Sequence, residues 1–398
     1  MKRFFILSGG LLVMLGLMIG LESCSNPSTT TLPGSWDRMG SFAGIPRQGA
    51  VSFVINDIAY VGLGYNGLNN IATAFLTDFW KYDPVADAWY QVASFPGAGR
   101  RDAVAFVMNG KAYVGTGYNI PNGVNNPLSD FYQFDPAGGV AGSGAWTRVS
   151  DFGVQQDTVV LLARYGCGAF TVNGRGFVGW GNDVNLYDYK DLWEFVPTAN
   201  SPKSVYPGVW IQRPGAGSKR AFPFIFVIND GHNDMAYVGG GYDQAGGQSY
   251  PVDFIRFDVS QLSNSGSGSP WSYLNGLTGK DKNGNAITQP RPRQQASTFS
   301  INGYGYITMG TAGGGDTWQY VPAVFDANGN IISGDIWNQY FSITTNVPIT
   351  GAARTDAVGF TVSVSGKSYG ILTTGGNGSS SFDDCWRFDP TGIEPDYK

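Results

Sequence analysis

Side chains that commonly do catalytic chemistry are scarce in this chain, which narrows the reactions open to it. The 398 residues include one histidine, His232, and three glutamates, Glu22, Glu194 and Glu394. One histidine cannot supply a zinc site of the common type, and His232 has no nucleophile motif around it for a Ser–His–Asp triad. Aspartates are plentiful, so glycosidase-type chemistry with two carboxylates stays open. No stretch, however, carries an obvious carboxylate pair outside repeated positions.

Arginine and aspartate recur at regular places instead. The arginines are Arg47, Arg100, Arg164, Arg220, Arg293 and Arg354, and the aspartates are Asp78, Asp130, Asp191, Asp253, Asp316 and Asp384. A symmetric scaffold rarely needs six identical catalytic groups. We therefore expect these residues to form ion pairs or backbone hydrogen bonds that lock strands and loops together. Function should lie where the repeats differ.

Two oxygen-rich stretches invite a calcium interpretation. They read DKNGN at residues 281–285 and DANGN at residues 326–330. Neither has the glycine and the distal glutamate of an EF-hand at the right places. Asn-Gly followed by a strand that begins with isoleucine is better explained as a hairpin turn. The sequence therefore predicts no metal site and no cofactor.

The repeat that carries the arginines occurs six times. Its copies read RQGAVSF at 47–53, RRDAVAF at 100–106, RYGCGAF at 164–170, RAFPFIF at 220–226, RQQASTF at 293–299 and RTDAVGF at 354–360. A turn such as Asn109-Gly110 and a second strand ending in glycine follow each copy. A third strand with alternating aromatics, such as DFWKYDP at 78–84, comes next, and a fourth strand begins with tryptophan.

Four strands per repeat and six repeats predict an all-β, six-bladed β-propeller with antiparallel blades. We expect blades at about residues 47–95, 100–150, 164–213, 220–274, 293–340 and 354–390. The first tryptophan strand, in residues 35–41, has no third strand before it, and the last repeat has no tryptophan strand. The N-terminal strand should therefore complete the last blade and close the ring.

The order of arginine, hairpin, glycine-ended strand, Asp-Pro and tryptophan resembles the kelch repeat from Trp36 to Pro390. This resemblance implies that the arginine-led strand lines a central channel. It also implies that the loops joining second to third strands and successive blades share the ligand-binding face. Kelch propellers include binding modules and enzymes alike, so the resemblance predicts fold more sharply than function.

Two enzymatic kelch families can be compared with the chain. Galactose oxidase is similar in its propeller, but its copper site needs two histidines, so the single histidine excludes that chemistry. The sialic acid mutarotases, which are six-bladed exported propellers, are thought to use Glu, His and Arg. Glu194 falls in a third strand, and His232 falls in a turn predicted on the opposite face. Those catalytic residues therefore do not carry over to this chain.

The loops after the glycine-ended strands differ between repeats and offer binding residues. Tyrosine beside asparagine or aspartate gives a flat apolar face next to hydrogen-bonding groups, which suits a sugar ring or a peptide. The candidate ligand-binding residues are Tyr65, Asn66, Tyr118, Asn119, Asn182, Asp183, Tyr242, Asp243 and Asn377, and, at the channel mouth, Arg101, Asp102, Gln294, Gln295 and Asp356. Equally, these loops can simply pave the surface.

The N-terminus reads as an export signal with a lipid-attachment site. Lys2 and Arg3 precede an apolar run at residues 4–21, and the sequence LESC at 21–24 resembles a bacterial lipobox, although Glu22 departs from its usual small residue. We expect a signal peptide at 1–23, a flexible tether at 24–34 and the propeller at 35–398. Cys24 would then anchor the protein in the cell envelope, and outer-membrane attachment is favoured because Ser25 is not acidic. Cys167 and Cys385 fall in different blades, so we expect free thiols.

Composition excludes one class of partner and leaves three function classes. A net charge of −5 without any Lys/Arg cluster argues against nucleic acid. The leading hypothesis is a non-enzymatic, lipid-anchored binding protein with a monomeric propeller and a carbohydrate or protein ligand. The alternatives are a sugar-modifying enzyme of the mutarotase kind and a structural module of an envelope complex.

Overall fold

The computed structural model describes residues 32–67, 71–262, 269–326, 328, 330–340, 353–378 and 380–393. Cys24, the predicted signal peptide and most of the predicted tether lie outside these residues. Each repeat begins with a hairpin, as in β6 (Val104–Met108) and β7 (Lys111–Gly115). Asn109 and Gly110 join them with φ angles of 52° and 70°, the left-handed backbone that a two-residue turn requires.

Six four-stranded antiparallel sheets make up the described chain. Blade I contains β2 (Val51–Ile55), β3 (Ile58–Gly62), β4 (Phe79–Asp83) and β5 (Ala88–Val92), and blade II contains β6, β7, β10 (Phe131–Asp135) and β11 (Ala145–Val149). Blade III contains β12 (Gly168–Val172), β13 (Arg175–Gly179), β14 (Leu192–Val196) and β15 (Val209–Arg213). Blade IV contains β16 (Phe224–Asn229), β17 (Asp234–Gly239), β18 (Ile255–Asp258) and β19 (Trp271–Tyr273). Blade V contains β20 (Ser297–Ile301), β21 (Tyr304–Thr308), β22 (Thr317–Val321) and β25 (Ile336–Tyr340). Blade VI contains β26 (Val358–Val364), β27 (Lys367–Thr373), β28 (Cys385–Asp389) and β1 (Ser35–Met39).

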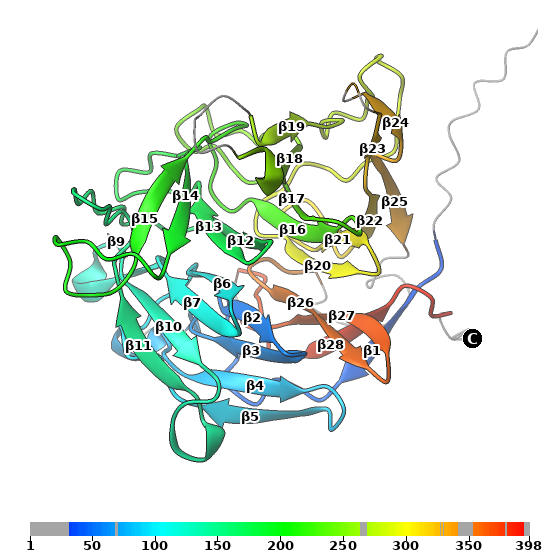
Figure 1. Cartoon of the computed structure of the whole chain (residues 1–398). Helices are drawn as coiled ribbons and strands as arrows, with labels where there is room; N and C mark the ends of the chain where they lie inside the picture. Colours follow the sequence, from blue (N-terminus) through cyan, green and yellow to red (C-terminus); the bar gives the residue numbers. More distant parts are fainter. Residues whose placement is uncertain are drawn as a thin grey trace, which may run out of the picture.

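The sheets surround a central axis, with β2, β6, β12, β16, β20 and β26 innermost (Figure 1). The N-terminal strand β1 pairs with β28, from Ser35 opposite Asp389 to Met39 opposite Cys385. Strands from the two ends of the chain therefore share one sheet, which closes the ring (Figure 1). The predicted six-bladed fold and its closure by the N-terminal strand are both confirmed.

Short elements occupy loops that join strands of the same blade. They are α1 (Ile71–Ala74), the hairpins β8 (Tyr118–Asn119) with β9 (Asn126–Pro127) and β23 (Val324–Phe325) with β24 (Ile331–Ser333), and the 3₁₀ turns Pro121–Gly123, Val140–Gly142 and Val259–Gln261. Cys167 and Cys385 are free thiols. Among the described residues, no helix has the length and apolar character needed to cross a membrane.

The last phenylalanine of the repeat motif holds neighbouring blades together. Phe106 of β6 stacks on Tyr113 of its own blade at 5.3 Å between ring centroids. Phe195 of blade III packs against the same Tyr113 at 5.2 Å. The same triad of rings recurs at four other junctions, as with Phe53, Tyr60 and Phe134. Aromatic contacts of this kind add about 0.5–1.5 kcal/mol each beyond their buried area.

Each repeated arginine forms an ion pair with the third-strand aspartate of its own blade. In blade II, two guanidinium nitrogens of Arg100 contact the two Asp130 carboxylate oxygens at 2.6 and 2.8 Å. The same guanidinium donates to the Thr116 carbonyl at 3.0 Å and lies over the Phe95 ring. The Arg100 side chain is fully buried. A paired and hydrogen-bonded charge of this kind fastens the loops to the sheet.

The glycine after each second strand joins one blade to the next. The Gly117 amide donates to the Arg164 carbonyl of blade III at 2.8 Å, and the equivalent bond is present at all six junctions. Gly117 has a φ of 86°, and a Cβ atom there would lie 2.6 Å from the Arg101 carbonyl oxygen. Only glycine suits both the conformation and the close approach.

Candidate functional site

The mouth of the central channel is bounded by one residue from each blade, the second after the repeated arginine. We call these six residues the mouth ring: Gly49, Asp102, Gly166, Phe222, Gln295 and Asp356. All six have left-handed backbone, with φ between 54° and 64°. At five of the junctions the amide of one member donates to the carbonyl of the member in the preceding blade, at 2.7 to 3.4 Å. The mouth ring thus has one repeated backbone geometry and different side chains.

The mouth ring and the residues directly before the inner strands line a cavity of about 140 Å³. Asp102 and Asp356 are its charged lining residues, and Phe222 and Gln295 contribute to the wall. A Cβ atom at Gly49 would lie 2.5 Å from an Asp102 carboxylate oxygen. Glycine at that place therefore leaves room for the Asp102 carboxyl group, which blade II extends over blade I.

Three charged side chains meet here, and we call them the carboxyl cluster: Arg101, Asp102 and Asp356. The Nε of Arg101 donates to Asp102 at 3.1 Å, and an Nη of Arg101 donates to Asp356 at 2.8 Å. The side chains of Asp102 and Asp356 are 4% and 7% exposed, and that of Arg101 is 14% exposed. One guanidinium thus bridges two nearly buried carboxyl groups that are contributed by blades II and VI.

Burial raises the pKa of Asp102 to about 7, and the Asp356 carboxylate adds to this rise while Arg101 opposes it. Burial also raises the pKa of Asp356, against hydrogen bonds from Arg101, Gln295 and Thr355. The pKa of Arg101 stays above its usual range, since the two carboxylates outweigh the effect of burial. Both carboxyl groups therefore hold a proton more tightly than a free aspartate does, which suits a group that donates or accepts a proton near neutral pH.

Aromatic rings surround the carboxyl cluster on its outer side. The Arg101 guanidinium lies over the rings of Tyr65 and Tyr118, at 5.8 and 6.0 Å from their centroids. Tyr118 packs on Tyr165 at 4.6 Å, and Tyr165 packs on Phe222 at 6.1 Å. Backbone bridges join Arg101 to Tyr118 and the equivalent Gln48 to Tyr65, so the loops after β3 and β7 lie directly beside the mouth ring.

The structure therefore brings together Tyr65, Tyr118, Arg101, Asp102 and Asp356 from the predicted set. Gln294 lies one residue outside the mouth ring, with its backbone hydrogen-bonded to Thr311. Asn119 donates to the Gly99 carbonyl at 3.1 Å.

The other predicted side chains support their own loops, although the backbones of Asn182 and Tyr242 bridge to Tyr165 and Ala221 as Tyr118 does to Arg101. Asn182 is buried and donates to Asp188 at 2.5 Å. Asp183 and Asp243 accept backbone amides within their turns, Asn66 donates to the Thr73 carbonyl, and Asn377 accepts the Ser380 amide. Tyr242 packs on Tyr250 at 5.2 Å.

Two aromatic residues of the mouth were not among the predicted candidates. Tyr165 and Phe222 belong to copies of the arginine motif in which no charged residue follows the arginine. The available signal was positional, because both occupy the first or second place after a repeated arginine. Reading those two places across all six copies would have included them.

The remaining candidates for chemistry have structural partners. Glu194 is held by Arg175 at 2.7 Å and by Arg213 at 2.6 Å, and His232 lies in the exposed turn between β16 and β17. Asp281 and Asp326 accept amides from their own turns, as hairpin residues do. In the described part of the chain, no group of three or more His, Cys, Asp or Glu residues is placed to hold a metal ion.

Comparison with known proteins agrees with this architecture. No family model matches the chain. The structure of the protein YjhT is similar, with a TM-score of 0.57 and 15% sequence identity, over 87% of this chain and 95% of that one. Both the strand topology and this likeness make the chain a six-bladed β-propeller. It is also 35% identical over 97 residues to the N-acetylneuraminate epimerases of Shigella flexneri and of Escherichia coli strain K12.

That sequence match is local. It covers 24% of this chain and spans 26% of the length of each epimerase. The propeller is thus distantly similar to these epimerases in sequence, while the structural likeness to YjhT extends around the ring.

Proposed function

We propose that the chain is a binding protein that holds a neutral sugar ring at the mouth of its central channel. The carboxyl cluster, whose guanidinium lies over the rings of Tyr65 and Tyr118, carries this proposal. Paired hydroxyl groups of a sugar match carboxylate oxygens and guanidinium N–H groups. The C–H face of the ring matches an aromatic side chain.

Charge supports a neutral sugar in preference to an acidic one. The guanidinium of Arg101 already contacts both Asp102 and Asp356. A ligand carboxylate would have to displace one of these aspartates and would meet the negative charge of the other. The epimerases with a local sequence match are named for N-acetylneuraminate, which is an acid. The ligand proposed for this chain is therefore an uncharged sugar.

Titration calorimetry with a panel of neutral monosaccharides and short oligosaccharides tests the proposal on the full-length protein in detergent. We expect Tyr118→Ala to weaken binding by about 10- to 100-fold, since it removes a stacking surface of the mouth. Tyr304→Ala is the matched control, because Tyr304 is exposed on β21. Failure of every sugar to bind, or binding that survives Tyr118→Ala, would refute the proposal. Binding of peptides alone would favour a protein partner, and no ligand at all would favour a structural module.

A second candidate function is the exchange of sugar anomers, favoured by the raised pKa of Asp102 and by the local match to epimerases. In this reaction the protonated carboxyl group donates to the ring oxygen while the ionised one accepts the anomeric hydroxyl proton. The bond between C1 and the ring oxygen breaks, C1 becomes an aldehyde, and rotation about C1–C2 before closure inverts the anomer. No oxidant or cofactor is needed, and both protons return on closure.

Anomer-exchange NMR separates catalysis from binding alone. Asp102→Asn should abolish any acceleration and keep sugar affinity within a few-fold of the native value, because the amide retains the size of the acid. If the native protein does not accelerate exchange of a sugar that it binds, the enzymatic function is wrong and the binding function stands.

The envelope location is part of the same proposal. Lipid attachment through Cys24 would hold the propeller at the outer membrane, in line with the lipobox resemblance. Leu32 bridges to Tyr340, so the described chain begins at the outer rim of blade V. Metabolic labelling with palmitate, compared with Cys24→Ser, tests the attachment. A labelled Cys24→Ser protein would rule it out.

A further inference from the structure

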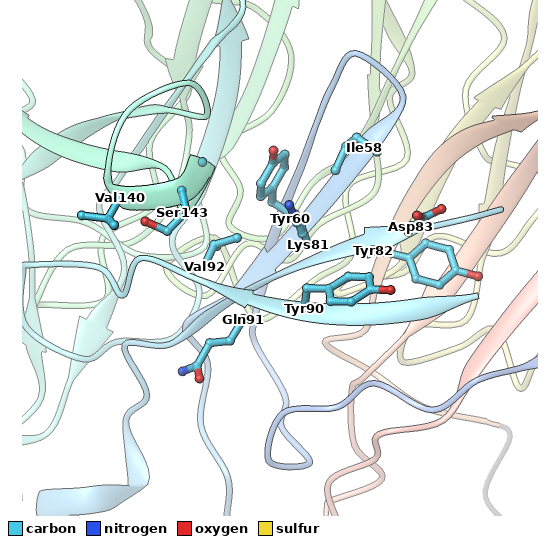
Figure 2. Close-up of a pocket in the computed structure, with 12 residues that line it drawn as sticks. Ile58, Tyr60, Lys81, Tyr82, Asp83, Tyr90, Gln91, Val92, Val140 and Ser143 are labelled. Atoms are coloured by element: carbon cyan, nitrogen blue, oxygen red, sulfur yellow. The ribbon is translucent and has the colours of Figure 1, made fainter. Parts of the chain in front are cut away.

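A second cavity lies away from the channel, between the outer part of blade I and a loop of blade II (Figure 2). We call it the side pocket, and its volume is about 530 Å³. One wall is a cross-strand row on blade I, in which Tyr60 of β3 lies opposite Lys81 of β4, and Lys81 lies opposite Tyr90 of β5. The other wall is the loop at residues 140–143. Ile58 and Asp83 place the side pocket towards the hairpin-turn ends of the strands, opposite the channel mouth.

The loop wall is anchored to blade I. The Ala93 amide donates to the Ser143 carbonyl at 2.8 Å, and the Trp146 indole donates to the Ala93 carbonyl at 2.9 Å. Gly144 has a φ of 78°, and a Cβ atom there would lie 2.2 Å from the Phe134 ring. The side pocket is therefore formed by tethered backbone that needs glycine at its hinge to the sheet.

The polar groups of this row have partners in other blades. Opposite Tyr113, in the place of Lys81, is Gln133, which donates to the Tyr113 hydroxyl at 2.7 Å. In blade V, Gln319 donates likewise to the Tyr306 hydroxyl at 2.8 Å. In blade III the corresponding residue is Glu194, which pairs with Arg175 and Arg213. In blade IV it is Arg256, which lies over the Phe325 ring, and in blade VI it is Arg387, which donates to Asp37.

Blade I differs from the other blades in this row. Among the described residues, neither the Lys81 ammonium nor the Tyr60 hydroxyl has a hydrogen bond or ion pair. Tyr60 is only 6% exposed, and both residues line the side pocket. Asp83 is nearby, but one of its carboxylate oxygens already accepts the amides of Val85 and Ala86. Both groups face the open space of the side pocket, where a ligand can accept hydrogen bonds from them.

We propose that the side pocket binds a small carboxylate with an apolar ring, such as an aromatic acid. The carboxylate would accept hydrogen bonds from Lys81 and Tyr60, and the ring would lie against Tyr90, Val92 and Val140. Asp83, Gln91 and Ser143 also line the side pocket, and the apolar side chains beside the two donors favour a ligand that carries a ring. Tyr90 is 49% exposed and Val140 is 87% exposed, so the rim of the side pocket presents apolar surface that a ligand would bury. This site is independent of the sugar site at the channel mouth.

Saturation-transfer NMR and titration calorimetry with benzoate, with benzyl alcohol as the neutral probe, test the proposal on the full-length protein in detergent. Benzoate should bind, and benzyl alcohol should bind at least tenfold more weakly, because a hydrogen bond to a charged partner is the stronger kind. Lys81→Gln should weaken benzoate roughly 10- to 100-fold and leave benzyl alcohol unchanged. Tyr60→Phe should weaken benzoate by several-fold.

Two further variants make the result specific. Lys111→Gln removes a lysine of blade II that pairs with Asp135 outside the side pocket, and it should leave benzoate binding unchanged. Val140→Glu changes an exposed loop residue, so folding is not at risk, and it should abolish benzoate binding by placing a competing carboxylate at the rim. Absence of benzoate binding, equal affinity for the two probes, or benzoate binding that survives both Lys81→Gln and Val140→Glu would overturn the proposal. None of these results bears on sugar binding at the mouth.

Discussion

Replacing Asp102 by asparagine should stabilise the protein at neutral pH and leave its stability nearly unchanged at pH 4. The folded protein holds the Asp102 proton more tightly than the unfolded chain does, because the pKa rises from its ordinary 3.8 to about 7 on folding. Stability is therefore lost as the pH rises from about 4 to about 7, and the loss is complete above pH 7. Asparagine has the shape of the protonated acid and does not titrate.

The size of this stabilisation follows from the difference between the pKa values of Asp102 in the folded and unfolded protein. Each pH unit is worth about 1.4 kcal/mol, so the interval from 3.8 to about 7 corresponds to at most about 4 kcal/mol. Asp356 shares Arg101 with Asp102, and burial raises the pKa of Asp356 as well. The destabilisation at neutral pH is therefore distributed over both carboxyl groups. We expect a gain on the order of 2–4 kcal/mol for Asp102→Asn at pH 8, and a gain of the same sign for Asp356→Asn.

Urea unfolding between pH 4 and pH 9 measures this difference directly. Asp57→Asn, in an exposed turn, is the control and should follow the native protein at every pH. Below pH 4 all variants should lose stability together, because Arg47 outweighs burial and holds the pKa of Asp78 below its usual range. A constant offset between Asp102→Asn and the native protein across this range, or a loss of stability at pH 8, would refute the assignment of a proton to the carboxyl cluster.

Three further substitutions test the framework by chemical or thermal unfolding. Arg100→Met should lower the free energy of unfolding by about 3–5 kcal/mol, since it leaves the mostly enclosed Asp130 carboxylate without its cation. The double variant Arg100→Met/Asp130→Leu should recover most of that loss, and a double variant no more stable than the single one would contradict this. Gly117→Ala should lower the free energy of unfolding by about 2 kcal/mol or more, because of its φ of 86° and the contact of a Cβ atom with the Arg101 carbonyl oxygen. Gly110→Ala, with open space around it, should lower it by less than half as much. Trp36→Ala should cost about 3–5 kcal/mol and speed proteolysis of the N-terminal strand, because the Trp36 ring is 5% exposed and packs on blades V and VI; unchanged proteolysis would argue against closure of the ring by β1.

The repeated framework could be predicted from the sequence because each repeated residue makes the same contact in every blade. The arginine pairs with the aspartate of its own blade, and the glycine donates to the next arginine carbonyl. Both contacts recur in every blade, so they leave a signal in a single sequence. The closure by β1 followed from counting strands, since the first repeat had one strand too many and the last had one too few.

The site was only partly predictable, for a physical reason. Arg101 and Asp356 are 255 residues apart in the sequence and belong to blades on either side of blade I. Their contact needs the closed ring and also Gly49, whose lack of a side chain lets the Asp102 carboxyl group reach inward. No local pattern records such an arrangement. The asparagines of these loops were predicted to bind a ligand, yet Asn182 and Asn119 hydrogen-bond within the loop framework.

The mouth ring offers an independent reason to place function there. Left-handed backbone costs glycine little, and Gly49 and Gly166 show that glycine is compatible with this ring. Asp102, Phe222, Gln295 and Asp356 adopt the same conformation with side chains, at a cost of about 1 kcal/mol or more each. Phe222 is the strongest case, because a bulky ring is rarely found at positive φ. The contacts of these side chains offset this strain, as in the ion pairs of Asp102 and Asp356 with Arg101, and the same side chains line the cavity at the channel mouth.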